Sequence, residues 1–396
     1  MKSLSAPNLS TTSAPVRRLL PYAHQVVTEQ DIAAVTRVLR SEWLTTGPEV
    51  EQFEAELAAR VGARHAVAFT SATAALHGAV SAAGVQAGDE GITSPMTFCA
   101  TANCLVFAGA VPVFADVEEQ TLTLDPAQAA RRLTRRTKVI LPVDYAGHPA
   151  QLDELRTLAR RRKLLVIEDA CHALGAEDRG RTIGSLSDIT IFSFHPVKHI
   201  TTGEGGMAVT NSAALAHRLR RFRNHGIVRP SRDAVRRPWY YEMADLGYNY
   251  RIPDILCALG RSQLSRLDAN LARRRAIAAQ YARALGALPG VRVPSVRSGA
   301  NPAWHLYPIR IDAKRAGIGR DEAIRRLRAE GIGATVHYIP VTRHPFYRKR
   351  FGCRPSDFPV AERAFRQLIT LPLFHGMTDE DVRDVIDAMI RMMGGA

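Results

Sequence analysis

The sequence is poor in cysteine and aromatic residues, and it has no long apolar run. Five cysteines without paired spacing argue against a disulfide framework or a zinc finger, so we expect a reduced, cytoplasmic protein without a metal centre. Aromatic residues make up 7% and do not alternate with the basic runs, so no stacking platform for single-stranded nucleic acid is visible. No stretch approaches a membrane span, and the first residues lack the apolar core of a signal peptide.

The charge is strongly basic, with 53 Lys+Arg against 38 Asp+Glu and a net charge of +15. This excess keeps a basic regulatory or nucleic-acid-binding protein as one alternative. No named DNA-binding motif is present, however, and the basic residues are spread over many helical segments. We therefore interpret the excess as an arginine-rich solvated surface, part of which would attract a diphosphate, and we expect no nucleic-acid partner.

Lysine is the scarcest of the common charged residues, and one lysine has an unusual setting. Lys198 follows an apolar strand predicted over 189–194 and precedes the glycine-rich turn 203–206, which permits close backbone approach. Surface positions in this chain are nearly always arginine, which cannot deprotonate, whereas lysine can form a Schiff base. Taken alone, the stretch fits a reactive amine or an ordinary loop lysine.

Short apolar strands alternate with helical stretches along most of the chain. This rhythm predicts βαβ units and a mostly parallel sheet, with ligands bound at the carboxyl ends of the strands. We expect a disordered arm over 1–20, a large domain over 21–270, and a linking helix with a small α/β domain over 271–396. The first helix should begin at the N-cap Thr28, with one apolar face formed by Ile32, Val35, Val38 and Leu39.

Two strand ends carry further chemical signals. The strand at 65–69 leads into Thr70, Ser71, Ala72 and Thr73, small residues whose free N–H groups at a helix start would hold a phosphate. The strand at 164–167 ends in Glu168 and Asp169, and a carboxylate near a Schiff-base lysine is what pyridoxal chemistry requires. The alternative for the first motif is an ordinary helix start capped by Ser71. The alternative for the second is that Glu168 and Asp169 simply cap or form a salt bridge at the loop.

Several spaced motifs together resemble the DegT/DnrJ/EryC1/StrS sugar aminotransferases, which are fold-type I enzymes that use pyridoxal 5'-phosphate (PLP). The resemblance runs from about Pro21 to the C-terminus. The motifs that carry it are Leu44 to Pro48, Thr70 to Leu76, Thr97-Phe98, Glu168 to Ala170, Ser193 to Gly206, Asn224 to Gly226, and Gly247 to Arg251.

The resemblance implies roles for individual residues. Lys198 would hold PLP as a Schiff base, Asp169 would pair with the pyridine nitrogen, and His172 would lie beside the ring as a third catalytic residue. Phe98 would stack on the ring face. The cofactor shell would be completed by Ser71, Ala72, Thr73 and Ser193 around the phosphate and by Asn249 from the partner subunit of a homodimer. His337 and Tyr338 would line the substrate pocket.

The resemblance also implies a reaction. The branches most similar to this chain place an amine on C4 of a UDP-linked ketosugar. We therefore expect amino transfer from an amino acid, with L-glutamate as the expected donor, to a nucleotide-linked keto-deoxysugar. The residues leave open UDP or dTDP, C4 or C3, and a non-nucleotide ketone. Ketosugar dehydration by the same fold is an alternative, although members that dehydrate carry a histidine where this chain has Lys198.

Overall fold

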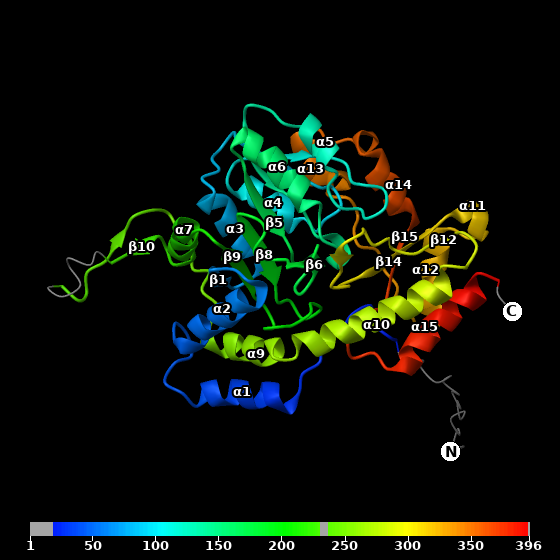
Figure 1. Cartoon of the computed structure of the whole chain (residues 1–396), viewed down its shortest axis with the longest axis horizontal. Coiled ribbons are helices and arrows are strands. Elements are labelled where there is room, and N and C mark those ends of the chain that lie inside the picture. Colours follow the sequence, from blue (N-terminus) through cyan, green and yellow to red (C-terminus); the bar gives the residue numbers. More distant parts are fainter. Residues whose placement is uncertain (1–18, 230–236, 395–396) are drawn as a thin grey trace, which may run out of the picture.

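The computed structural model describes residues 19–229 and 237–394 and places a seven-stranded sheet at its centre (Figure 1). Six of the strands are parallel to one another, and only β9 runs the other way. The predicted α/β fold with a mostly parallel sheet is therefore confirmed. The strand order is β1 (His65–Phe69), β9 (Gly206–Thr210), β8 (Ile189–Ser193), β5 (Leu165–Asp169), β4 (Thr137–Leu141), β2 (Glu90–Thr93) and β3 (Val111–Phe114).

The direction of β9 follows from the connection that precedes it. Parallel strands need a long crossover, usually a helix, whereas antiparallel neighbours are joined by a short link. The link from β8 to β9 contains no helix, and β9 pairs antiparallel with both β8 and β1. Lys198 lies in this short link.

Helices cover both faces of the sheet, because its strands are apolar on both sides. In β1, Ala66 and Ala68 belong to one buried cluster, while Val67 and Phe69 belong to the other. One face is packed by α3 (Ala72–Ala82), α4 (Ala100–Phe107) and α7 (Ala213–Arg223). The other face is packed by α2 (Pro48–Val61), α5 (Pro126–Arg131), α6 (Leu152–Arg162) and α9 (Asp254–Leu264).

The C-terminal part has its own apolar core around a three-stranded antiparallel sheet. That sheet consists of β12 (Val291–Arg292), β14 (Tyr307–Ile311) and β15 (Leu368–Leu371). The helices of this part are α11 (Ala313–Ala316), α12 (Arg320–Ala329), α13 (Pro345–Phe351), α14 (Pro359–Gln367) and α15 (Asp379–Met392). The remaining short strands are β6 (Glu177–Asp178), β7 (Arg181–Thr182), β10 (Ile227–Val228), β11 (Glu242–Met243) and β13 (Ala300–Asn301).

The long helix α10 (Leu267–Leu285) connects the two cores, as Figure 1 shows. Leu271 packs in the core of the large sheet, whereas Ile277 and Tyr281 pack in the C-terminal core. The helix begins four residues earlier than the predicted domain boundary at 271 and is shared by both parts. The division of the chain into domains at that residue stays a prediction.

The last residue of the predicted N-terminal arm is ordered in the structure. Residues 1–18 lie outside the described residues, but Leu20, assigned to the arm, is buried in the C-terminal core. Its backbone is fixed by bonds from Leu20 N to Gly331 O and from Gly333 N to Leu20 O, both 2.8 Å long. An arm that extends through residue 20 is therefore wrong, because an apolar side chain and two backbone bonds hold that residue.

Helix α1 (Glu29–Leu39) begins at Thr28 as predicted, with a capping box completed by Asp31. Its expected apolar face behaves differently. Val38 is buried, but Ile32 and Leu39 are 51% and 56% exposed. The helix instead buries Asp31, which accepts bonds from Ser262 and Arg266 at 2.7 Å. Polar anchoring to α9 and the link that follows it leaves part of the apolar face uncovered within one chain.

Candidate active site

The carboxyl ends of the central strands surround a cavity of about 450 Å³. The geometry follows from parallel strand order, because neighbouring strands end at the same edge of the sheet. Residues after β1, β2, β5 and β8 all reach this cavity. Ten predicted site residues line it: Ser71, Ala72, Thr73, Phe98, Asp169, His172, Ser193, Lys198, His337 and Tyr338.

Lys198 is held by the turn after β8. Its N–H donates to the carbonyl of His195 at 2.9 Å, and Thr202 N donates to Phe194 O at 3.0 Å, which fixes the loop on both sides of the lysine. Burial of the amine lowers the pKa of Lys198, while nearby Cys171 and Asp169 act in the opposite direction. A lysine with a lowered pKa has a larger fraction of free amine at neutral pH and is a better nucleophile.

Asp169 is the last residue of β5 and is held by two hydrogen bonds. Thr101 Oγ1 donates to its Oδ2 at 2.6 Å, and the N–H of Cys171 donates to its Oδ1 at 3.2 Å. Thr101 also lies 2.7 Å from the hydroxyl of Thr97, so a buried hydroxyl pair orients the carboxylate. This arrangement suits a carboxylate that pairs with a cationic heterocycle inside the cavity.

The start of helix α3 forms an anion-binding arrangement. Ser71 is the N-cap, and its hydroxyl accepts from Ala74 N at 3.1 Å. Within the described residues, the N–H groups of Ala72 and Thr73 have no hydrogen-bond partner. These free donors at the positive end of an 11-residue helix suit a phosphate group.

Gly206 explains the predicted close backbone approach. A Cβ at this position would lie 2.4 Å from Ala72 N and 2.5 Å from the carbonyl carbon of Ser71. No side chain fits in that space, so β9 packs directly under the first residues of α3. Glycine is needed at this position because only a residue without a Cβ lets the two backbones approach so closely.

The residues beyond the cofactor region form an aromatic wall. The Tyr338 hydroxyl lies 3.0 Å from His172 Nε2, and the two rings stack with centroids 5.9 Å apart. His337 Nδ1 lies 3.1 Å from the hydroxyl of Thr370 in the C-terminal sheet. Burial first, and then Lys198, hold the pKa of His172 well below its usual value, so the imidazole is neutral at pH 7. Phe98 is 57% exposed and presents its ring at the cavity.

Sequence reasoning missed three residues of the cavity region. His305 and Tyr22 line it, and Thr101 supports Asp169 from behind. Thr101 lies in the first turn of α4, just after the Thr97-Phe98 motif, and this closeness in sequence was a usable signal. Neither His305 nor Tyr22 carries a comparable signal, because both arrive from distant parts of the chain.

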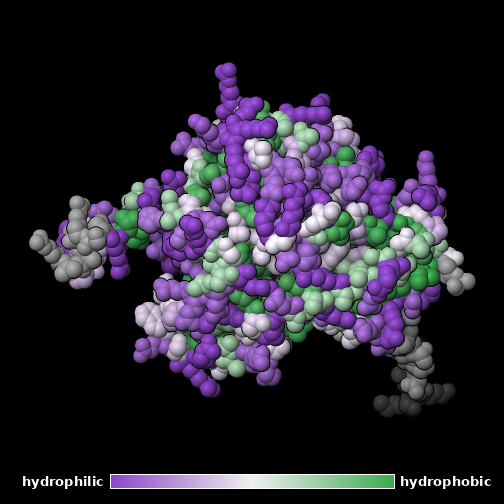
Figure 2. All heavy atoms as spheres, in the orientation of Figure 1, coloured by the Kyte–Doolittle hydropathy of each residue, from purple (hydrophilic) through white to green (hydrophobic). Residues whose placement is uncertain are grey.

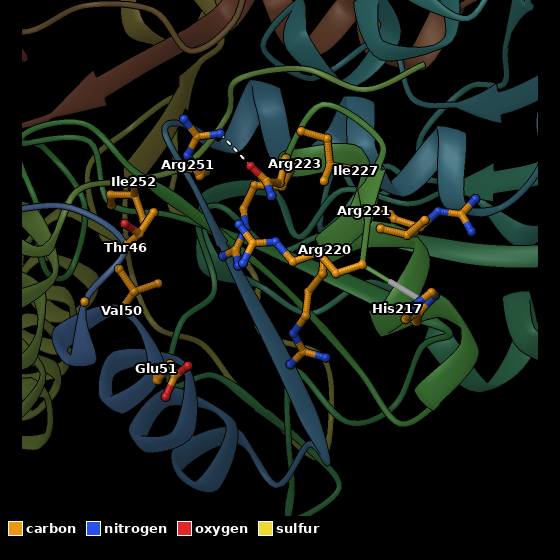
Figure 3. A pocket seen from close by; sticks show the side chains of 14 residues that line it. Thr46, Val50, Glu51, His217, Arg220, Arg221, Arg223, Ile227, Arg251 and Ile252 are labelled. Carbon is orange, nitrogen blue, oxygen red and sulfur yellow. Dashed lines mark hydrogen bonds between the residues drawn. The ribbon is translucent and has the colours of Figure 1, made fainter. Parts of the chain in front are cut away.

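Asn249 is the one predicted cofactor residue that does not line the cavity of its own chain. It is exposed and forms an isolated bridge with Asn224. Asn224 in turn lines a second cavity, of about 460 Å³, shown in Figure 3. Arg251 and Arg220 also line this cavity, and Arg251 Nη1 donates to Asn224 Oδ1 at 2.6 Å. The second cavity collects part of the excess positive charge of the chain.

Three further observations concern thiols, metal ligands and membrane spans. All five cysteines carry free thiols. In residues 19–229 and 237–394, no group of three or more His, Cys, Asp or Glu side chains could hold a metal ion. Over the same residues, no helix is both long and apolar enough to cross a bilayer.

Comparison with known proteins matches the model of the DegT/DnrJ/EryC1/StrS aminotransferase family to residues 25–390. The spore coat polysaccharide biosynthesis protein SpsC of Bacillus subtilis is 44% identical over 95% of this chain and 98% of its own length. Helicobacter pylori PseC, an aminotransferase of pseudoaminic acid biosynthesis, is 30% identical, with a TM-score of 0.89 over 96% of this chain and all of PseC. The PLP form of the putative sugar aminotransferase Spr1654 from Streptococcus pneumoniae is 29% identical, with a TM-score of 0.88 over 95% and 99% of the two chains.

Proposed function

We propose a specific reaction for this chain, which belongs to the DegT/DnrJ/EryC1/StrS family and, by its family and its structural neighbours, is a PLP-dependent sugar aminotransferase. The proposed reaction is amination of C4 of a UDP-linked keto-deoxysugar, with L-glutamate as the amino donor. The observation that carries this proposal is the meeting of Lys198 and Asp169 in one cavity beneath a free helix N-terminus. Amine, carboxylate and anion donors are the three groups that PLP requires.

The residues present fit PLP. The unpartnered N–H groups of Ala72 and Thr73, with the hydroxyls of Ser71 and Ser193, would hold the phosphate. Asp169 would pair with the ring nitrogen, and the exposed ring of Phe98 would cover one face of the cofactor. When bound, PLP supplies an electron sink for the carbon that loses a proton.

Each catalytic residue then has a defined task. Lys198 would bind the cofactor through its amine, and the same Nζ would take up and return the α-proton. Burial favours this proton shuttling, because it brings the pKa of the ammonium down toward neutrality. Asp169 would face the ring nitrogen, with its carboxylate oriented by the hydrogen bond from Thr101. His172 stays neutral and orients Tyr338 toward the cavity.

Two features support a nucleotide-linked sugar as the acceptor. SpsC and PseC, named for polysaccharide and pseudoaminic acid biosynthesis, support a sugar. The arginines of the second cavity support a diphosphate, since guanidinium groups bind phosphate in a bidentate manner. His337 and Tyr338 would contact the sugar itself, because they line the cavity from the C-terminal part of the chain.

A homodimer is part of this proposal. The extension that carries β10 and β11 projects from the body of the molecule in Figure 1, and Figure 2 shows apolar residues along it. Three large side chains next to it, Trp239, Met243 and Leu246, are 72%, 68% and 72% exposed. Apolar surface of this kind favours burial against a second copy. The same surface would bring Asn249 and the arginine-lined cavity toward the partner's active site.

Free thiols support a reducing, cytoplasmic location.

A substrate panel tests the proposed reaction. The purified chain is incubated with PLP, L-glutamate and each of four ketosugar classes: UDP-linked or dTDP-linked, with the keto group at C4 or C3. Mass spectrometry should detect the amine product with the UDP-linked 4-ketosugar, and its absence from that arm would sink the proposal. A free ketosugar serves as the non-nucleotide arm, and loss of water without gain of amine would indicate dehydration.

Mixing two inactive variants tests the shared active site. Lys198→Ala and Asn249→Ala chains are each expected to be nearly inactive alone. After subunit exchange, the mixed dimer has one site with both Lys198 and the partner's Asn249 intact, so activity should return. Activity that stays at the level of the separate variants would show that Asn249 does not act across the interface. Light scattering on each sample checks that both remain dimeric.

A further inference from the structure

His305 has a direct contact with the reactive amine. Its Nε2 lies 3.5 Å from Lys198 Nζ, and His305 itself is only 2% exposed. In the part of the chain that the structure describes, no other side chain is within hydrogen-bonding distance of Nζ. An ammonium group only donates, so Nε2 must be the acceptor when Lys198 is charged.

The backbone around His305 is held in uncommon conformations. Trp304, directly before it, has φ 49°, and Ala146, whose carbonyl accepts from His305 N at 3.0 Å, has φ 60°. Gly147 has φ 94°, and a Cβ there would lie 2.7 Å from Trp304 N. Non-glycine residues keep left-handed conformations only where the surrounding structure holds them, and such positions gather at functional sites.

A buried arginine completes this support. Arg274 Nη1 donates to the carbonyls of Trp304 and His305 at 3.2 and 3.4 Å. The contact between Lys198 and His305 therefore depends on three separate parts of the chain: the loop after β4, the helix α10 and the segment before β14. Because all three parts hold its backbone, the His305 imidazole is fixed next to the amine. An ordinary core histidine would not need this support.

The protonation state of His305 suits an acceptor. Burial first, and then the charge of Lys198, hold the pKa of His305 well below its usual value, so the ring is neutral at pH 7. Other titratable or charged groups also face the amine from the elements packed around it: Asp169, Cys171, His172, His199, Arg274 and His337.

We propose that His305 is a further functional residue of this site, whose Nε2 accepts a hydrogen bond from the Lys198 ammonium and holds the amine in place. The role rests on the proposed function of Lys198. A hydrogen bond to the charged form stabilises that form, so His305 raises the pKa of Lys198 against the effect of burial. It also keeps Nζ pointed into the cavity while the lysine is not bound to the cofactor.

Three substitutions separate an acceptor from a space-filling ring. His305→Gln places an amide oxygen near the position of Nε2 and retains an acceptor, whereas His305→Phe keeps a ring without one. His305→Asn is polar but too short to reach Nζ, and it serves if the Phe variant does not fold. His77→Phe is the matched control, because His77 is also buried but lies among aromatic rings outside the cavity.

The readout is the pKa of Lys198 in the full-length chain freed of cofactor. Trace acetic anhydride is applied from pH 6 to 11, and mass spectrometry follows acetylation of the Lys198 peptide. His305→Phe and His305→Asn should lower the apparent pKa by about one unit or more, the equivalent of one charge-assisted hydrogen bond. His305→Gln and His77→Phe should titrate as the wild type does.

Two results would overturn the proposal. One is an unchanged titration in His305→Phe and His305→Asn. The other is an equal shift in all three His305 variants, which would make ring volume the important property. The labelling uses no PLP, so its outcome is independent of whether the wild-type chain binds PLP or transaminates, and failure of the proposed function would be seen separately in the substrate panel.

Discussion

Substitution of Gly206 by alanine tests whether the contact between β9 and α3 shapes the phosphate site. The added Cβ would lie 2.4 Å from Ala72 N, whereas ordinary contact begins at 3.4 Å, so the turn must move by about 1.0 Å. A hydrogen bond of about 2.9 Å from this turn to a phosphate would then lengthen beyond bonding distance. Each charge-assisted bond lost costs about 1.5–3 kcal/mol, which weakens PLP binding about 10- to 100-fold.

The assay is titration of PLP into the cofactor-free chain, followed by the absorbance of the lysine-bound cofactor. Gly203→Ala is the matched control in the same turn, because no heavy atom lies within 4 Å of a Cβ there. Its φ of 79° costs backbone strain of about 1 kcal/mol without displacing Ala72. Gly206→Ala with the wild-type dissociation constant would refute the reasoning, provided that thermal melting shows a folded chain.

Three further predictions concern single residues. Lys198→Ala should lose the absorbance of lysine-bound cofactor, and its turnover should fall by at least about 10²- to 10⁴-fold; retained transamination would contradict the assignment. Asp169→Asn should keep some PLP but lower turnover about 10- to 100-fold, and an unchanged rate would exclude its pairing with the ring nitrogen. Asp31→Asn should destabilise the fold by about 1–3 kcal/mol in urea unfolding at pH 7, since it breaks the buried contact with Arg266 at 2.7 Å. Burial alone would raise the pKa of Asp31, but the hydrogen bonds from Arg266 and Ser262 lower it. The stabilisation by Asp31 is therefore full above about pH 4 and is lost as pH falls through the lowered pKa. An equal loss of unfolding free energy in Asp31→Asn at pH 7 and pH 3 would contradict this origin.

The fold and the centre of the site are predictable because they depend on local patterns. Apolar strands of four or five residues alternate with amphipathic helices, and this rhythm is enough to predict a parallel sheet. Parallel strands then bring their carboxyl ends to one edge, so Ser71, Asp169 and Lys198 meet although they are far apart in sequence. Their individual roles stay predictions that the substitutions above test.

Residues that reach the site from other layers were not predictable in the same way. Thr101 acts through a hydrogen bond to Asp169, 68 positions away, and no periodicity connects the two. His305 depends on left-handed backbone at Trp304 and Ala146, which local propensity argues against. The exposed face of α1 was predicted wrongly for a related reason. The hydrogen bonds that Asp31 accepts from Ser262 and Gln263 determine how the helix lies on α9.

Lys198 lies in the link between two antiparallel neighbours of the large sheet, β8 and β9, and this position has a mechanical consequence. A helical crossover would place its residues well outside the sheet, whereas the link from β8 to β9 stays at the strand ends, with Phe194 N bonded to Gly205 O at 3.0 Å. The Lys198 backbone is thereby fixed over the carboxyl edge, and its long side chain reaches into the cavity. In the proposed function the amine would leave and rejoin the cofactor, and a long flexible stem on a fixed Cα would allow both positions. The link without a helix therefore explains both the reversed strand and the placement of the Lys198 amine.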